Sequence, residues 1–379
     1  MFSQYHRCGL LGVLLIIAPA LQASPLGLPP VPVPEDNPQS PAKIELGEKL
    51  FNDTRFSTTG DVSCATCHDP AKAFTDSPLA VSEGIHKARG TRNAPSVINA
   101  AYSELQFWDG REPDLERQST QPFINPIEMG LTDHQPILDV VRDDRAYQKL
   151  FRKAFDVKAK QITMTEVTQA LAAFERTIIS GNSPFDRYYF AGDKTAMSES
   201  AIRGFEVFLG DGRCVSCHTI SQDHALFTDH RFHNINVGFP AISAEIETMA
   251  KAFARAKDAG TNVDVAVLSN RDASELGRFA VDERWAEIGA FKTPTLRNIE
   301  LTAPYMHDGS LATLEEVVDH YNNGGKLQAG DPAPSGFLSG GIRPLELSDQ
   351  QKADLVAFME ALTSPEIREQ VATLEAQQR

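Results

Sequence analysis

The chain has 379 residues, of which 41% are hydrophobic, and its 36 basic and 51 acidic residues give a formal net charge of −15. This length is enough for two domains of ordinary size, each with its own core. The acidic balance argues against nucleic acid and against an anionic membrane surface as partners, and it suits a basic or neutral partner better.

The first 23 residues have the pattern of a secretory signal peptide. Arg7 precedes an apolar run over residues 10–20, which is far shorter than the roughly 20 residues that a membrane span needs. Cleavage is expected after Ala23, with Ala20 as a second candidate. The mature protein is therefore expected to be exported, and no later segment is predicted to span a membrane.

Residues 24–42 are rich in proline and poor in apolar anchors, which is typical of a poorly ordered lead. Helix-type spacing of apolar residues dominates from Lys43 onward, so the sequence predicts an all-α protein. A capping box formed by Thr163 and Glu166 opens one clear helix. The Gly- and Pro-containing stretch after that helix predicts a domain boundary near residue 190.

The cysteines carry the strongest chemical signal. Cys8 lies in the predicted signal peptide, and the other four form two copies of C-x-x-C-H, Cys64-Ala65-Thr66-Cys67-His68 and Cys214-Val215-Ser216-Cys217-His218. In this spacing the two thiols bond the vinyl groups of a haem and the next histidine ligates its iron. Zinc and thioredoxin-type sites also use C-x-x-C, but neither needs the adjacent histidine twice. The sequence therefore predicts two haem c groups and no disulfide framework.

The approaches to the two motifs resemble each other. Leu46-Gly47-x-x-Leu50-Phe51 precedes the first copy, and Arg203-Gly204-x-x-Val207-Phe208 precedes the second. This repetition predicts two tandem c-type cytochrome domains with one haem each, over residues 43–190 and 191–379.

From about residue 44 to residue 362, the sequence resembles the bacterial dihaem cytochrome c peroxidase and MauG family. The motifs that carry the resemblance are Leu50-Phe51-x-x-x-Arg55-Phe56-Ser57, Asn93-Ala94-Pro95-Ser96-Val97, Gln106-Phe107-Trp108-Asp109-Gly110-Arg111, Phe291-Lys292-Thr293-Pro294-Thr295-Leu296-Arg297-Asn298 and Pro304-Tyr305-Met306-His307-Asp308-Gly309. Export by the cleaved signal peptide predicts that such a protein is located in the periplasm. The resemblance implies that the haem ligated by His68 reacts with hydrogen peroxide, while the haem ligated by His218 stores or supplies electrons.

The resemblance assigns further roles around the first haem. Glu128 matches the acid–base residue, Gln118 matches the residue that orients peroxide, and Pro122 lines the same pocket; a lone glutamate is otherwise more often a solvated surface charge. Trp108 matches a tryptophan that mediates electron exchange between the haems, and the plain alternative is a core side chain. His86 is one residue off the spacing of a histidine that blocks the first haem in some resting peroxidases, and it is either that ligand or a surface histidine.

The distal ligand of the second haem separates two branches of the family. Peroxidases place a methionine there and MauG places a tyrosine, and the aligned residue in this chain is Tyr321. A phenolate oxygen stabilises ferric and higher iron states better than a neutral thioether, so Tyr321 favours MauG-like chemistry, in which aromatic side chains of a partner protein are oxidised. The alternative ligands that remain open are Met306, His307 and His320, and the alternative role for Tyr321 is a core aromatic.

Asn93, Thr302 and Pro304 match the family's calcium site, through one side-chain oxygen and two backbone carbonyls. Residues 241–287 are a mixed helical and loop insertion and a candidate partner-contact segment. The leading hypothesis is a peroxidase that reduces hydrogen peroxide with electrons from a small cytochrome c or cupredoxin. The alternative is a MauG-like enzyme that oxidises Trp or Tyr side chains of a protein substrate. A non-catalytic dihaem electron carrier is less favoured, because a carrier needs no proton-moving pocket.

Overall fold

The computed structural model describes residues 24–325 and 336–378. Over these residues the chain is mostly helical, and their only sheet pairs β1 (Phe232–His233) with β2 (Phe291–Lys292) in antiparallel fashion. The mostly helical architecture agrees with the expected class. The predicted signal peptide, residues 1–23, lies outside the described residues. None of the described helices is long and apolar enough to cross a membrane.

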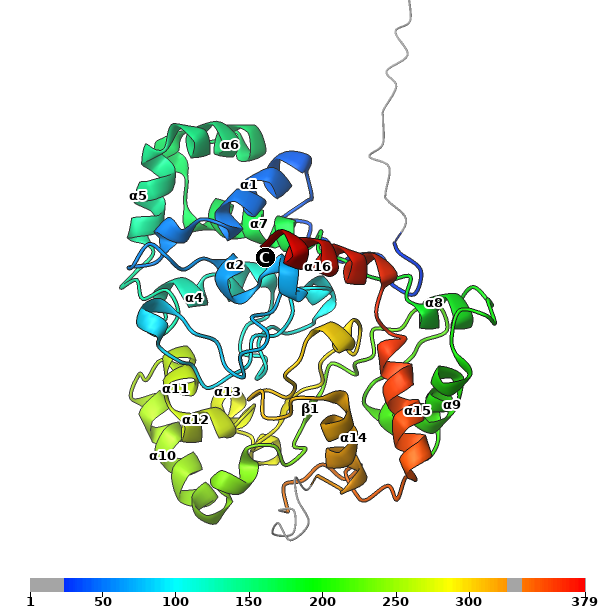
Figure 1. Cartoon of the computed structure of the whole chain (residues 1–379). Helices are drawn as coiled ribbons and strands as arrows, with labels where there is room; N and C mark the ends of the chain where they lie inside the picture. The colour runs from blue at the N-terminus through cyan, green and yellow to red at the C-terminus, as the bar shows by residue number, and fades with distance from the viewer. Residues whose placement is uncertain (1–23, 326–335, 379) are drawn as a thin grey trace, which may run out of the picture.

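The helices fall into three groups (Figure 1). The first half contains α1 (Pro41–Phe51), α2 (Cys64–Cys67), α3 (Leu115–Gln118), α4 (Gln121–Ile124), α5 (Gln135–Asp143), α6 (Arg145–Phe155) and α7 (Met164–Glu175). The second half contains α8 (Pro184–Tyr189), α9 (Glu199–Leu209), α14 (Leu314–Asn322), α15 (Asp349–Glu360) and α16 (Pro365–Gln378). The insertion contains α10 (Ile246–Asp258), α11 (Val263–Ser269), α12 (Arg271–Glu275) and α13 (Phe279–Asp282).

One helix pair occurs in both halves, and a glycine permits its close packing each time. Gly47 of α1 lies so near α7 that an added Cβ would overlap the carbonyl oxygen of Ala170. Gly204 of α9 lies in the same way against the carbonyl oxygen of Asp354 in α15. The helix that precedes each haem motif therefore packs closely on its partner helix, because a glycine without a Cβ leaves room for the partner's backbone.

Each group of helices has an apolar core of its own. The first core includes Leu46, Leu50, Phe51, Phe151 and Leu171. The second is an aromatic cluster that includes Phe185, Phe205, Phe208, Phe227 and Phe358. The third core packs Phe253, Val267 and Phe279 of the insertion with Phe239 and Ile288 at its two ends. The last helix, α16, crosses from α15 back to the first half (Figure 1), where Val371 joins the first core.

The proline-rich lead is packed over its described residues, which corrects the expectation of a poorly ordered segment. The carbonyl of Gly27 accepts hydrogen bonds from Arg297 Nη2 at 2.6 Å and from the N–H of Ala225 at 2.9 Å. Asn37 is only 1% exposed and donates to Glu116 Oε1 at 2.7 Å. Composition favoured disorder because apolar anchors are few, but polar side chains from both halves bind the backbone of the lead.

A longer internal repeat spans residues 93–123 (copy 1) and 292–322 (copy 2), at a constant offset of 199 positions. Asn99 and Asn298 have left-handed backbones, with φ of 65° and 60°, and each precedes a 3-10 turn. Each copy then forms a hairpin closed by one antiparallel bridge, Gln106 with Glu112 in copy 1 and Tyr305 with Leu311 in copy 2.

The two copies bind each other reciprocally. The N–H of Asn93 donates to the carbonyl of His307, and the N–H of Lys292 donates to the carbonyl of Trp108, both at 2.8 Å. Each donor begins its copy and each acceptor is the third residue of a hairpin. The contact between the halves therefore has an approximate two-fold relationship.

Candidate functional site

Both C-x-x-C-H motifs form a single tight turn. The first is α2, and the second begins with the 3-10 turn Cys214–Ser216. In each motif the N–H of the histidine donates to the carbonyl of the first cysteine, at 3.0 Å in the first and 2.9 Å in the second. All four cysteines are free and partly buried. The turns place two thiols beside a histidine, as covalent attachment of a haem requires.

The two motif histidines are oriented alike. His68 Nδ1 lies 3.2 Å from the carbonyl oxygen of Phe74, and His218 Nδ1 lies 2.8 Å from that of Phe227. With the Nδ1–H donating, each Nε2 keeps a free lone pair, which is the usual arrangement of metal-binding histidines. Burial lowers the pKa of both rings, so each is neutral, the form that ligates a metal. The residues present thus fit two haem irons.

A continuous cavity joins the two halves. It is lined by His68 and His218 and by residues from both copies of the repeat. The other sequence-predicted residues that line it are Cys64, Cys67, Asn93, Trp108, Gln118, Pro122, Glu128, Thr302, Pro304 and Tyr321. The fold therefore brings these residues together from segments far apart in the sequence.

Glu128 is half-buried in the turn that follows α4, and its Oε2, which is shielded from solvent, has no hydrogen-bond partner among the described residues. The pKa of Glu128 is raised to about 8, first by burial and then by the negative charge of Asp264, while Arg111 opposes the rise. A buried carboxyl that titrates near neutral pH can accept and return a proton. Gln118 ends α3 and Pro122 lies in the first turn of α4, and both line the same cavity.

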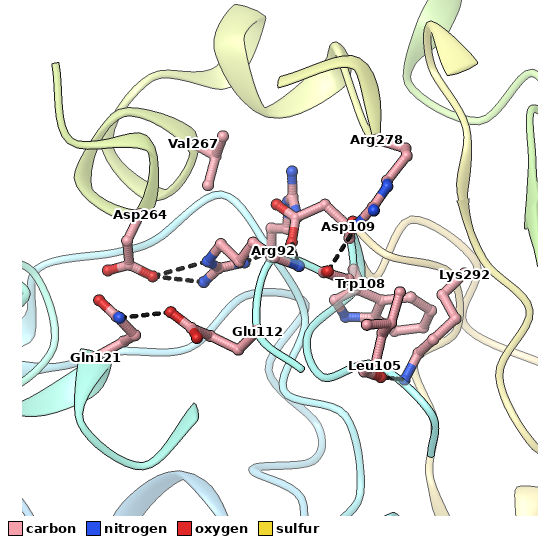
Figure 2. Close-up of polar contacts among 12 residues, drawn as sticks. Arg92, Leu105, Trp108, Asp109, Glu112, Gln121, Asp264, Val267, Arg278 and Lys292 are labelled. Atoms are coloured by element: carbon pink, nitrogen blue, oxygen red, sulfur yellow. Dashed lines mark hydrogen bonds and ion pairs between the residues drawn. The ribbon is translucent and has the colours of Figure 1, made fainter. Parts of the chain in front are cut away.

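Trp108 lies where the two halves meet (Figure 2). Its indole Nε1 donates to the carbonyl of Asn93 at 2.9 Å, and its own carbonyl accepts the N–H of Lys292. The side chain is thus fixed by the first half and the backbone by the second. This placement is compatible with the role in electron exchange, which stays a prediction.

Tyr321 lies on the last turn of α14 and lines the cavity. Burial, with smaller contributions from Cys214 and Cys217, raises the pKa of its phenol. His320 is not among the residues that line the cavity, and its Nε2 lies 2.8 Å from the carbonyl of Ile235. The structure therefore favours Tyr321 over the neighbouring histidine as a ligand of the second haem.

His307 and Met306 also line the cavity. His307 Nε2 lies 3.0 Å from Glu275 Oε2, and its ring stacks on Phe291 with the centroids 3.6 Å apart. Because Nε2 of His307 is engaged with Glu275, that nitrogen is not free to ligate the second haem in this structure. Met306 has a positive φ of 76° inside the second hairpin.

The repeat gives a reason why the two haem sites differ. At the offset of 199 positions Tyr321 corresponds to Pro122, just as Leu314 at the start of α14 corresponds to Leu115 at the start of α3. A proline side chain carries no atom that can ligate iron. The first site therefore lacks a ligand at the place where the second site has a phenol.

His86 is exposed on the 3-10 turn Ile85–Lys87, with φ of 54°, and it is not among the cavity-lining residues. The N–H of Ile85 donates to the carbonyl of Glu128 at 2.9 Å, which holds this turn beside the pocket. In this structure His86 is a surface histidine, and its position does not support a role as a ligand of the first haem.

The candidate calcium ligands Asn93, Thr302 and Pro304 line one cavity. Asn93 Nδ2 donates to the carbonyls of Leu79 and Ala80, at 3.4 Å and 3.2 Å. Because Nδ2 is engaged with the carbonyls of Leu79 and Ala80, Oδ1 of Asn93 points away from them. A side-chain oxygen in this position is the kind of hard donor that calcium prefers. Calcium binding itself stays a prediction.

Sequence reasoning missed a buried chain of charges that links the first half to the insertion (Figure 2). Arg92, Asp109, Arg111 and Asp264 alternate in sign, with N···O distances of 2.9, 3.0 and 2.7 Å along the chain. Asp109 and Arg111 belong to the motif Gln106–Arg111, so the two charged residues of that motif could have indicated a buried ion pair. Asp264 lies 153 positions from Arg111 in the insertion, where no motif marks it.

Two further clusters of ligand-type side chains occur in the described part of the chain, Cys217 with Asp229 and His233, and Glu275 with His307 and Asp308. The first cluster loses its thiolate once Cys217 is bonded to haem. Most of the predicted site residues line the cavity between the two motif histidines, which is therefore the main candidate site. Its donor sets are those of a dihaem c-type cytochrome.

Comparison with known proteins gives the same class. Residues 41–195 match the family model described as di-haem cytochrome c peroxidase. The chain is 37% identical over 332 residues to the methylamine utilization protein MauG of Methylorubrum extorquens, covering 88% of this chain and 81% of that protein. It is 32% identical over 332 residues to the cytochrome c551 peroxidase of Nitrosomonas europaea, covering 88% and 83%.

A crystal structure of a MauG-like protein associated with microbial copper homeostasis matches with a TM-score of 0.73 at 33% identity, covering 91% of this chain and 96% of that one. The chain belongs to the dihaem cytochrome c peroxidase family, in which MauG is also found. The predicted resemblance is thus confirmed. Membership makes the protein a peroxide-dependent oxidoreductase with two haem c groups.

Proposed function

We propose that this protein is a periplasmic peroxidase that reduces hydrogen peroxide to water with electrons from a small cytochrome c or cupredoxin. Glu128 carries the proposal, because its carboxyl has a solvent-shielded oxygen without a hydrogen-bond partner among the described residues, in the cavity that His68 also lines. Burying such a group costs stability, and a pure electron carrier gains nothing from it.

The chain's own residues supply proton transfer and orientation. Bound haem iron supplies the redox centre at which the O–O bond is cleaved. Glu128 accepts a proton from one peroxide oxygen and returns it to the other, so that the second oxygen leaves as water. Gln118 orients the peroxide by hydrogen bonding. Each peroxide takes up two electrons from the donor protein and two protons from solvent, and yields two water molecules.

The second half stores electrons in this proposal. His218 and Tyr321 would hold the second iron, and Trp108, which is hydrogen-bonded to both halves, would mediate electron exchange between the haems. Asn93, Thr302 and Pro304 would hold a calcium ion, which would stabilise the contact between the halves. That contact contains the reciprocal backbone bonds, so loss of calcium is expected to loosen it.

A second candidate function is MauG-like oxidation of a partner protein. Tyr321 favours it, because a phenolate ligand stabilises the higher iron states that storage of oxidising equivalents requires. In this case Trp or Tyr side chains of the partner lose two electrons per peroxide, and the products are a modified partner and two water molecules.

The test is the rate at which the ferric holoenzyme reacts with peroxide, followed by stopped-flow spectroscopy. Glu128→Gln is expected to lower this rate by about 10²- to 10⁴-fold, because the proton acceptor is lost. Glu175→Gln is the matched control, since Glu175 is also buried, lines the cavity and has a pKa raised to about 8 by burial. Equal loss in both variants would argue against a specific role for Glu128.

Turnover with reduced cytochrome c separates the two functions. Steady peroxide-dependent oxidation of the donor supports the peroxidase. Reaction with peroxide without donor turnover supports the MauG-like function. A wild-type enzyme that does not react with peroxide at all would contradict both.

A further inference from the structure

Asp264 in the insertion is buried although it lies in the first turn of α11, a place where acidic residues usually face solvent. It is 5% exposed. Its Oδ1 accepts hydrogen bonds from Arg111 Nε at 2.9 Å and Nη2 at 2.7 Å, and its Oδ2 accepts one from Asn125 Nδ2 at 2.7 Å. Every one of these donors lies in the first half, in or next to the peroxide pocket.

Asn125 in turn organises the segment that carries Glu128. Its Oδ1 accepts the N–H of Ile127 at 3.0 Å, and its carbonyl accepts the N–H of Glu128 at 3.2 Å and of Gly130 at 2.8 Å. Asn125 thus accepts three of the hydrogen bonds that close the turn around Glu128. Because Asp264 holds the side chain of Asn125, the insertion contributes to the position of that turn.

Asp264 also balances charge at the pocket. The buried chain of Arg92, Asp109, Arg111 and Asp264 has two cations and two anions, so it is neutral as a unit. Without Asp264 one cation is unopposed, next to Glu128. The ionisable groups that act on Glu128 are Asp264 and Arg111, and the thiols of Cys64 and Cys67 also interact with it before haem attachment converts them to thioethers.

We propose that Asp264 is a positioning residue for the peroxide reaction, which fixes the turn that carries Glu128 and opposes the charge of Arg111 there. This inference rests on the acid–base role proposed above for Glu128. It makes the insertion a structural part of the peroxide site, although the insertion belongs in sequence to the second half.

The test is the pH dependence of the bimolecular peroxide rate in holoenzyme shown to carry both haems. The wild-type rate is expected to rise with pH through the pKa of Glu128, because the carboxylate accepts the proton. Asp264 raises that pKa and Arg111 lowers it, so Asp264→Asn is expected to move the midpoint down by about 1 pH unit. Asp264→Glu keeps the negative charge, so its midpoint is expected to lie close to that of the wild type. Glu287→Gln removes one charge from the same insertion at a different place and is expected to leave the midpoint unchanged.

An unchanged or higher midpoint in Asp264→Asn, with Glu128→Gln still abolishing the pH dependence, overturns this inference and leaves the proposed function standing. Absence of any peroxide reaction in the wild type overturns the proposed function instead. If Asp264→Asn does not acquire both haems, Asn125→Ser tests the same link with the charge intact. It is expected to slow the reaction about tenfold by moving the turn, and an unchanged rate overturns the inference.

Discussion

The two halves of the molecule share the same backbone arrangement over the repeat. They differ at the position of Tyr321, the predicted distal ligand of the second haem. Copy 1 and copy 2 of the repeat present the same left-handed asparagine, the same bridge-closed hairpin and a helix that starts at corresponding leucines. In that arrangement Pro122 corresponds to Tyr321. If Tyr321 ligates the second haem as proposed, one side chain on a common backbone arrangement distinguishes the two haem sites.

The halves differ also in what separates the motif histidine from the repeat. His68 is followed closely by Asn93, whereas the insertion lies between His218 and Lys292. The insertion folds back onto the first half, where Asp264 binds Arg111 and the side chain of Ser274 accepts a hydrogen bond from Arg92 at 2.9 Å. The extra structure of the second half thus supports the pocket of the first.

The largest expected effect comes from making the first site like the second. Pro122→Tyr places a phenol at the position that corresponds to Tyr321, and it is expected to close the first haem. The reaction with peroxide should fall by at least about 100-fold, and the high-spin signal of the ferric enzyme should disappear from its electronic and electron paramagnetic resonance spectra. A high-spin haem that persists and still binds cyanide would contradict the correspondence between Pro122 and Tyr321.

The reverse comparison tests the second site. Under the proposed ligation, Tyr321→Met exchanges a phenolate oxygen for a neutral thioether, so the potential of the second haem is expected to rise by on the order of 0.1 V in a spectroelectrochemical titration. His320→Gln is the matched control on the same helix turn, and it is expected to leave the potential nearly unchanged because His320 does not line the cavity. A shift in the control but not in Tyr321→Met would assign the ligand elsewhere.

A smaller effect is expected from the shared helix packing. Gly204→Ala places a methyl group against the backbone of α15, and Gly47→Ala does the same against α7. Each is expected to destabilise the protein by about 1–3 kcal/mol, measured by denaturant unfolding. Gly192→Ala is a control for the loss of a glycine, since an added Cβ there meets nothing within 4 Å. Its φ of 76° costs backbone strain, without a steric clash.

The smallest effect is expected at His86. Because this side chain is exposed and does not line the cavity, His86→Ala is expected to leave the ferric spectrum and the peroxide rate within about twofold of the wild type. A new high-spin signal in the variant would show that His86 ligates the first haem in the resting enzyme.

Much of the candidate site could be predicted because its residues stand in short motifs. The cysteine and histidine spacing indicated the haem turns, and the family motifs indicated Glu128, Gln118, Trp108 and Tyr321. The packed lead was not predictable in this way. Its backbone is bound by Arg297 and by the N–H of Ala225, and nothing in the local composition indicates so distant a partner.

The amino-acid sequence alone determined the two covalent attachment sites, the helical class and the family, because each of these depends on residues a few positions apart. Only the tertiary structure decided that Asp264 binds Arg111 and Asn125, that His86 lies outside the cavity and that the repeated hairpins of the two halves bind each other. These facts depend on burial and on contacts between residues that the chain separates by more than a hundred positions. Local spacing carries no record of such contacts, since they exist only once both halves have packed together.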